Sequence, residues 1–347
     1  MSFPFVQPYF GLGNSLQTAQ AGGAASVGGW VELARTTNGG AASTIDVSSL
    51  ADKRYYMILN SYAGSRDSFM RFNADSGSNY AYRLQVDGAL GSHVNQDKIE
   101  INGAASGTNA RLSVGYVANL STKEKLLQSW TVKQQAGGAG TAPNRAESVG
   151  KHAQTSNPID QMTIVNTGST FPAGAELVVL GWDPADEHTT NFWEELASVS
   201  GTGSSTEISS GTISAKKYLW LQMWNDTGAT SYTNMTFNND TASNYARRTS
   251  EDGTADSTAV SEAAALIPPN VTGPHFMNIF IINNSANEKL CIFSNVGGSS
   301  AGAATAPVRS EGVFKWANTS AQITEIDMTS SSGNYTSNSI LKVWGAN

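Results

Sequence analysis

The sequence predicts an all-β protein built from two tandem antiparallel β-sandwiches of jelly-roll type, with an extended N-terminal arm in front of them. Three observations carry this prediction: one long phrase occurs twice, runs of strand-forming residues recur at short intervals, and Ser, Thr, Asn and Gly dominate the polar positions. Such polar residues favour turns and strand surfaces over helix interiors. The expected boundaries are an arm at 1–29, one sandwich at 30–184 and its duplicate at 185–347.

The duplication is visible in paired phrases along the whole chain. FNADSGSNYAYR at 72–83 matches FNNDTASNYARR at 237–248 in eight of twelve positions, and TAPNRAESVGK at 141–151 pairs with TAPVRSEGVFK at 305–315. WVELA at Trp30 pairs with WEELA in the second half. The spacing stays at about 164 residues, which indicates two copies of one domain rather than a short-period repeat. Each copy, at roughly 150 residues, is long enough to bury its own core.

The individual strands follow from apolar runs between turn signals. Turn residues separate these runs at intervals of about 10 residues, as in a sandwich or barrel, so eight to ten strands are expected in each copy. In ARLSVGYV, Leu112, Val114 and Tyr116 alternate with small or polar residues, which predicts one buried face. The runs are KRYYMILNSY, SFMRFNAD, ARLSVGYVAN, QMTIVN and AELVVLGW, then KKYLWLQMW, NMTFNND, HFMNIFIINN, KLCIFSNV and ILKVWG.

One pattern favours a helix instead, and it occurs in both copies. Ser121-x-x-Glu124 and Ser285-x-x-Glu288 fit the capping box that begins many helices. The residues that follow, such as KLCIFSNV, have no helical spacing and are rich in β-formers. A turn followed by a strand is therefore the prediction, with a single helical turn as the alternative.

Composition limits the classes of function. A net charge of -7 with 14% charged residues gives no basic surface, so nucleic acid is not expected as a partner. No run of 18 apolar residues occurs, so membrane insertion is not expected. The arm has no Lys or Arg and two early prolines, which makes it a poor secretory signal. A single cysteine, Cys291, excludes a disulfide within the chain.

The repeated phrase is a candidate calcium site. Asn73 and Asp75, like Asn238 and Asp240, place side-chain oxygens of the kind that calcium takes at alternate positions. Each loop supplies only one carboxylate, and the EF-hand pattern is not matched. The preferred interpretation is an Asx-turn at each Asp, with the tyrosine near the end of each phrase entering the core. No other cofactor is expected, and the four scattered histidines do not suggest a zinc site.

A second repeated pattern pairs Arg145 with Glu147 and Arg309 with Glu311. Side chains two residues apart in a strand share a face, so an arginine could support a catalytic acid there. Glycoside hydrolysis needs a second placed carboxylate, and no partner recurs in both copies. The preferred interpretation is an ion pair on a strand, and no enzymatic activity is expected.

The tryptophans suggest a third function, carbohydrate binding, because the flat face of an aromatic ring packs well against the apolar face of a sugar ring. Most aromatic residues in strands of this composition are expected in the core. The sequence leaves open which of the four candidates are exposed. The candidates for glycan stacking are Trp130, Trp220, Trp224 and Trp316.

Several phrases resemble a β-rich module of structural proteins from tailed phages, many of them marine. They are FNNDTASNYARR, EKLCIFSNV, APVRSEGVFKWANTSAQIT and the final LKVWG, and the resemblance covers 30–182 and 193–347. It implies a virion component of tail-fibre or head-decoration type, made in the host cytoplasm. In the first copy WANTSAQIT becomes HAQTSNPID, so a contact made by Trp316 is expected to be lost there.

The expected function is therefore a non-enzymatic virion protein, a surface, decoration or fibre component that assembles by sandwich packing and arm docking. Phe3, Phe5, Tyr9 and Phe10 would dock the arm on a neighbouring subunit, with a disordered terminus as the alternative. Expected partners are further copies of the chain, a trimer being one option, other capsid or tail proteins, and a host-surface glycan. Two alternatives stay open: a double-jelly-roll capsid shell protein with side-by-side sandwiches, and a carbohydrate-binding host-recognition module.

Overall fold

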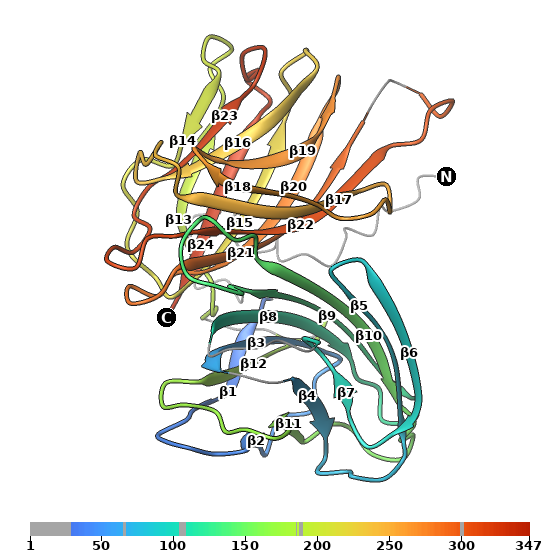
Figure 1. The fold of residues 1–347 in the computed structure, drawn as a ribbon. Helices are drawn as coiled ribbons and strands as arrows, with labels where there is room; N and C mark the ends of the chain where they lie inside the picture. The colour runs from blue at the N-terminus through green and yellow to red at the C-terminus, as the bar shows by residue number, and fades with distance from the viewer. Residues whose placement is uncertain (1–28, 65–66, 104–108, 185, 187–189, 299–301) are drawn as a thin grey trace.

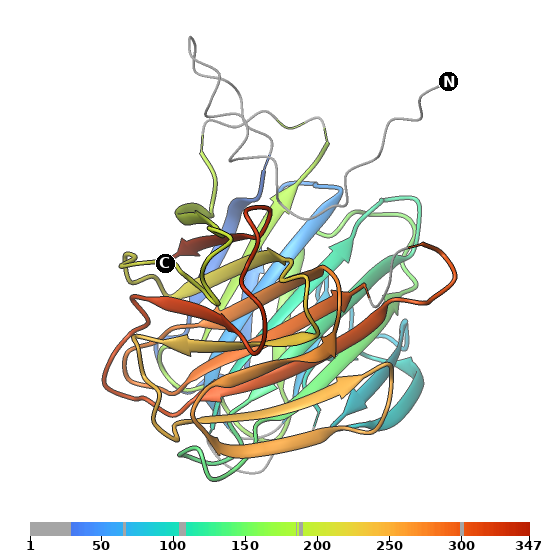
Figure 2. The same cartoon turned by 90° about the horizontal axis from the view of Figure 1, so that it is seen from above.

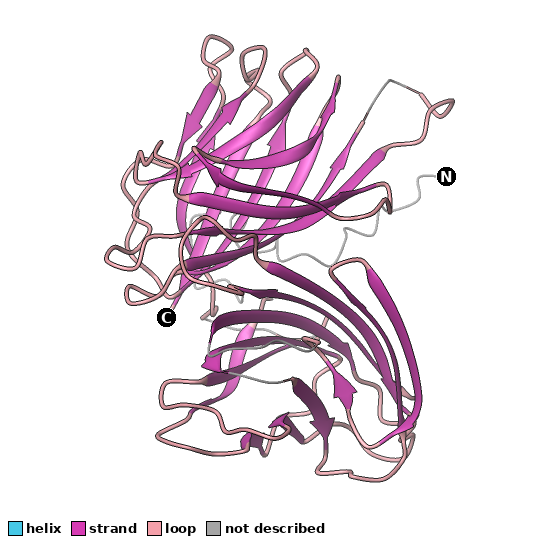
Figure 3. Ribbon diagram, viewed as in Figure 1, coloured by secondary structure: helices cyan, strands magenta, loops and turns pink. Residues whose placement is uncertain are grey.

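The computed structural model describes residues 29–64, 67–103, 109–184, 186, 190–298 and 302–347, and every regular element in these ranges is a strand (Figure 3). The predicted fold class is confirmed, because the strands form two antiparallel sandwiches, each with a sheet of eight strands and a sheet of four. The eight to ten strands expected per sandwich were too few. Within the described ranges no helix exists that could cross a membrane. The predicted arm, with Phe3, Phe5, Tyr9 and Phe10, lies outside them.

The first sandwich consists of twelve strands. They are β1 (Val31–Thr37), β2 (Thr44–Ser48), β3 (Tyr55–Gly64), β4 (Ser68–Phe72), β5 (Tyr80–Val86), β6 (Ala89–Gln96), β7 (Ile99–Glu100), β8 (Asn109–Ala118), β9 (Lys125–Lys133), β10 (Asn144–His152), β11 (Gln161–Asn166) and β12 (Glu176–Trp182). The large sheet has the order β1-β12-β3-β8-β9-β10-β5-β6, and the small sheet has the order β2-β11-β4-β7.

The second sandwich repeats this topology strand for strand. Its strands are β13 (Glu194–Ser200), β14 (Glu207–Ser209), β15 (Tyr218–Asn225), β16 (Ser231–Phe237), β17 (Tyr245–Glu251), β18 (Ser257–Glu262), β19 (Ala265–Val271), β20 (His275–Ile282), β21 (Lys289–Gly297), β22 (Val308–Trp316), β23 (Ile326–Ser330) and β24 (Ile340–Ala346). The orders are β13-β24-β15-β20-β21-β22-β17-β18 and β14-β23-β16-β19, so each strand keeps the neighbours of its counterpart. Even the register shift in the first strand recurs, between Glu32 and Ala34 and between Glu195 and Ala197.

All ten predicted apolar runs coincide with strands. QMTIVN is β11 itself, and the other runs differ from the observed bounds by a few residues. Both capping-box segments form a turn before a strand, since β9 begins at Lys125 and β21 at Lys289. The helical alternative is therefore wrong at these two places.

Each sandwich closes a core of its own between its large and small sheets. In the first, Phe72, Met162 and Ile164 from the small sheet pack against residues such as Tyr56 and Tyr80 from the large one. In the described part of the chain, the core of the second sandwich consists of residues from the second half. Both cores therefore follow the duplication that the sequence predicted.

A third core lies between the sandwiches. The two large sheets face each other and the small sheets lie on the outside (Figure 1), and from above the strands of one large sheet cross those of the other (Figure 2). The predicted burial of Leu112 and Val114 is confirmed, but the other sandwich covers them rather than their own small sheet, and Tyr116 of the same predicted face is only partly buried. We call this layer the seam. Its buried residues include Met57, Leu59, Leu112, Val114, Val132, Val178 and Leu180 from the first sandwich and Tyr218, Trp220, Phe280, Leu290, Ile292 and Trp344 from the second.

Candidate functional site

The repeated phrase forms the same corner in each sandwich. In the first copy the N–H of Gly77 donates to Asp75 Oδ1 at 2.8 Å, and Asn79 Nδ2 donates to Asp75 Oδ2 at 2.9 Å. The Tyr80 side chain is buried, and its hydroxyl accepts from the Phe72 N–H at 3.0 Å and donates to the carbonyl of the same residue at 3.1 Å. The phrase is thus an Asx-turn fastened to the core by a tyrosine, as the preferred interpretation predicted.

The second corner keeps the Asx-turn and the buried tyrosine of this arrangement, and the Tyr245 hydroxyl donates to the carbonyl of Asp240 at 3.1 Å. Asp240 accepts from the Ala242 N–H at 2.9 Å and from Asn244 Nδ2 at 2.8 Å. The hydroxyl of Tyr245 accepts from the Phe237 N–H at 2.9 Å. The corner is therefore a structural unit that each sandwich needs once.

The corners differ in the side chain that closes them. Trp316 Nε1 donates to Asp240 Oδ2 at 2.6 Å. The sequence led us to expect that this contact is lost in the first copy, and that expectation was wrong. His152 Nε2 lies 2.8 Å from Asp75 Oδ2, and its ring stacks on Tyr80 with centroids 4.4 Å apart. An imidazole N–H thus replaces an indole N–H.

The hydrogen bonds at the corners explain the ionisation of both aspartates. Partial burial alone would raise each pKa, but the N–H donors around each carboxylate favour the charged form. For Asp75 these donors are His152, Gly77 and Asn79, and the pKa lies below its usual value. The pKa of Asp240 is lowered in the same way, with Trp316 among the donors.

The calcium prediction is not tested by this arrangement, but the candidate ligands serve other partners. Asn73 accepts from the N–H of Asp160 at 2.9 Å, and Asn238 accepts from the N–H of Thr324 at 2.8 Å. Both asparagines have φ near 50°, a backbone conformation that Asn tolerates better than most residues. Among the described residues no group of three or more His, Cys, Asp or Glu is placed to hold a metal ion.

Two of the four tryptophans predicted for glycan stacking are buried. Trp220 lies in the seam, stacked on Phe280 at 5.6 Å, and Trp316 lies in the second core. Neither presents a face to solvent, so the prediction fails for both. Trp130 is partly buried beside the seam and Trp224 is 43% exposed, so the prediction stays untested for these two.

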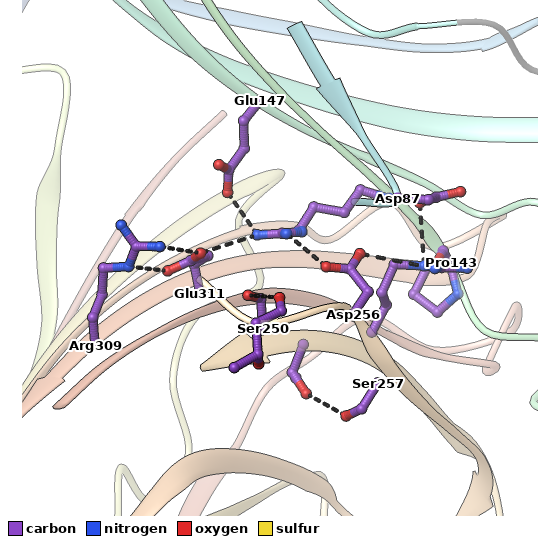
Figure 4. Close-up of polar contacts among 12 residues, drawn as sticks. Asp87, Pro143, Glu147, Ser250, Asp256, Ser257, Arg309 and Glu311 are labelled. Atoms are coloured by element: carbon purple, nitrogen blue, oxygen red, sulfur yellow. Dashed lines mark hydrogen bonds and ion pairs between the residues drawn. The ribbon is translucent and has the colours of Figure 1, made fainter. Parts of the chain in front are cut away.

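A cluster of charged side chains, centred on Arg145, lies at one side of the seam (Figure 4). Arg145 from β10 lies 2.7 Å from Asp256, which belongs to the turn between β17 and β18 in the other sandwich. It also lies 2.9 Å from Glu147 and 3.5 Å from Glu311, and the dashed lines in Figure 4 run from the carboxylates of Glu147, Glu311 and Asp256 to the guanidinium between them. Burial raises the pKa of Glu147, although the guanidinium of Arg145 opposes that shift. The predicted ion pair between Arg145 and Glu147 is confirmed, and a cross-sandwich partner is added.

A second polar contact closes another part of the seam. Lys315 Nζ lies 3.3 Å from Glu288 Oε2, and both side chains are almost fully buried. The loop between β9 and β10 covers them, because Lys315 donates to the carbonyls of Gln134 and Ala136 and the Gly138 N–H donates to Glu288. Burial lowers the pKa of Lys315, which Glu288 partly offsets.

Beside these contacts the seam opens into an aromatic cleft that the sequence did not predict. It consists of a cavity of about 490 Å³ and a second of about 150 Å³, and both are lined by Tyr116. Tyr55 and Trp182 stack with centroids 5.5 Å apart, and Trp30 lies 6.4 Å from Trp182. We define the aromatic cleft by Trp30, Tyr55, Tyr116, Leu126, Val149 and Trp182 of the first sandwich and Phe276 and Phe280 of the second.

No alternation rule could have revealed this cleft. Trp30 and Trp182 are neighbours because β1 and β12 pair, although they stand at opposite ends of the first copy.

The remaining histidines also form no site among the described residues: His93 stacks on Tyr82 at 4.6 Å, and burial lowers the pKa of His275.

Comparisons with known proteins add little. No family model matches the chain, and no curated protein matches it. Among solved structures it is similar to domains LG4-5 of the mouse laminin α1 chain, with 10% identity, a TM-score of 0.21, and 91% of this chain and 90% of that chain covered. The two C2 domains of extended-synaptotagmin 2 give 7% identity and a TM-score of 0.09, with 76% and 92% covered. At these TM-scores the likeness carries no argument about function.

Proposed function

We propose that the protein is a non-enzymatic structural component of a phage virion and acts there as one rigid block. The observation that carries the proposal is the seam, a third apolar core to which both sandwiches contribute. Domains joined through a large apolar interface do not move as independent bodies. Rigid blocks whose β-surfaces carry few charges suit a particle that is built from many copies of its parts; only 14% of this chain is charged.

The phage assignment is supported by the repeated phrases, which resemble those of tailed-phage structural proteins. A decoration or fibre role fits better than a capsid shell. The shell alternative expects side-by-side sandwiches, whereas these sandwiches stack through their large sheets. We do not propose carbohydrate binding as the main function, because two of its four tryptophans are buried.

Purified particles of the phage that encodes the chain would test this proposal. Quantitative mass spectrometry of gradient-purified particles should find the chain at a fixed copy number, and gold-labelled antibodies should decorate one part of the particle. The chain is also expected to associate with further copies of itself or with neighbouring virion proteins. Its absence from particles, with recovery only in the soluble lysate, would contradict the proposal.

A further inference from the structure

The lining of the aromatic cleft restricts what can bind there. Among the residues that the structure describes, those that line the two cavities are all uncharged. The side chains that offer contact are mostly aromatic or aliphatic, and Leu126 and Val149 at the wall are each more than half exposed. An apolar surface of this kind gains from burial against an apolar partner, and charged groups would lose hydration there. The matching occupant is therefore uncharged and rich in aromatic side chains.

The chain carries a segment of this composition. Residues 1–13, MSFPFVQPYFGLG, contain four aromatic residues and two prolines, and residues 1–29 contain no Asp, Glu, Lys, Arg or His. Proline restricts the backbone to extended conformations, so such a segment loses less conformational freedom when it binds. Aromatic rings of the segment can pack edge-to-face or offset against those of the cleft.

The attachment point of the segment favours the cleft of its own chain. Trp30 lines the cleft, and β1 begins at the next residue. Residues 14–28 between the apolar segment and this point are mostly Gly, Ala, Ser and Gln. A connection of about 15 residues reaches up to about 50 Å when fully extended, and such a connection holds the segment at an effective concentration of about 1 mM or more. A segment from another molecule would have to compete with that concentration.

We propose that the aromatic cleft binds residues 1–13 of its own chain. This differs from the docking on a neighbouring subunit that the sequence led us to expect, and it does not depend on a role in a virion. The segment fills the opening of the seam and adds contacts to both sandwiches, since Phe276 and Phe280 face it from the second one.

A peptide with the sequence of residues 1–13 is the direct probe. It should bind a chain that lacks residues 1–13, measured by tryptophan fluorescence and calorimetry, and should bind the full chain at least tenfold more weakly because the tethered segment competes. Val149→Glu and, separately, Leu126→Glu place a carboxylate on the exposed wall of the cleft. Each should weaken peptide binding at least tenfold without unfolding the chain.

The matched control is Leu90→Glu. Leu90 is an exposed leucine on β6 of the same large sheet and lines neither cavity, so this change should leave peptide affinity unaltered. Equal affinity for the Val149→Glu, Leu126→Glu and Leu90→Glu chains, or no binding to the truncated chain at millimolar peptide, would overturn the proposal. Binding of an oligosaccharide in place of the peptide would overturn it as well.

Limited proteolysis of the full chain separates binding within one molecule from exchange between molecules. Chymotrypsin should cut slowly after Phe5, Tyr9 and Phe10 in the unaltered chain and at least tenfold faster in the Val149→Glu chain, at a rate independent of protein concentration. Slow cleavage only at high concentration, together with an oligomer that Val149→Glu dissolves, would overturn the assignment to the chain's own cleft.

Discussion

Arg145 and Arg309 stand at the same place in two copies of one phrase, yet their surroundings differ. Each backbone N–H donates to the aspartate of the preceding hairpin, Asp87 or Asp252, at 2.8 and 2.9 Å. The side chain of Arg145 is 3% exposed and contacts the other sandwich, whereas that of Arg309 is 63% exposed. The two copies therefore share the local backbone hydrogen bond, but the burial of the arginine side chain differs between them.

The difference in side-chain exposure between the two copies is reversed at the other end of the same two strands, β10 and β22. Lys151 on β10 pairs with Glu124 and is 48% exposed, while Lys315 on β22 pairs with Glu288 and is fully buried. In the first sandwich the beginning of β10 is therefore buried in the seam, whereas in the second sandwich the end of β22 is buried there. Two sandwiches of the same topology therefore meet through different parts of the same face.

The largest difference is expected between the two arginines. Arg145→Ala leaves the carboxylate of Asp256 buried with only a 3.8 Å contact to Arg248, so it should lower the free energy of unfolding by about 3–5 kcal/mol. Arg309→Ala removes an exposed ion pair and should cost below about 1 kcal/mol. Urea denaturation measures both. Equal losses would mean that the cluster in Figure 4 is not buried.

A matched pair of leucines separates the apolar part of the seam from its charges. Leu290 is fully buried in the seam, while its counterpart Leu126 is 54% exposed. Leu290→Ala should cost about 2–5 kcal/mol because it opens a cavity. Leu126→Ala, made in a chain that lacks residues 1–13, should stay within about 0.5 kcal/mol. Similar urea midpoints for the two variants would argue against a shared core.

The closing side chains of the corners provide a smaller test. Trp316→His copies the first corner into the second, keeping a ring N–H for Asp240 but losing volume beside Phe237 and Tyr245. We expect a loss of about 1–3 kcal/mol in thermal or urea unfolding. The reverse change, His152→Trp, should also destabilise by about 1–3 kcal/mol because it overpacks the first corner. No loss in either variant would mean that the corners are interchangeable.

The smallest effect is expected in acid. Asp75 and Asp240 both have lowered pKa values in the folded chain, so their contribution to stability is complete above the unfolded pKa of about 4 and is lost as pH falls through the folded values. The Asp75→Asn and Asp240→Asn double variant should show a shallower decline of the unfolding free energy below pH of about 4. An unchanged slope would exclude these carboxylates as a source of the acid dependence.

The sequence predicted the structural features that both sandwiches share, but it did not predict the features in which they differ. Alternation in β8 predicted the burial of Leu112 and Val114, but alternation says only that a face is covered and not by which layer. Strands with little burial were missed, because β6 is exposed along most of its length and so carries no apolar pattern. The Asx-turn was predictable because its bonds join residues within one phrase.

The seam and the cleft could not be predicted from one copy of the pattern. Arg145 and Arg309 have nearly the same neighbours in sequence, and only the partner sandwich distinguishes them. For the same reason Trp220 was a plausible surface aromatic until a second sheet was found to cover it. The contact between Arg145 and Asp256 depends on the docking of two folded sandwiches, which no local rule describes.

The labelling rates of two lysines test the asymmetric seam most directly. The native chain is treated briefly with an amine acetylating reagent, and peptide mass spectrometry then gives the rate at each lysine. The account predicts that Lys151 reacts at the rate of a surface lysine and that Lys315, under the loop between β9 and β10, is protected at least tenfold. Equal rates at Lys151 and Lys315 would contradict it.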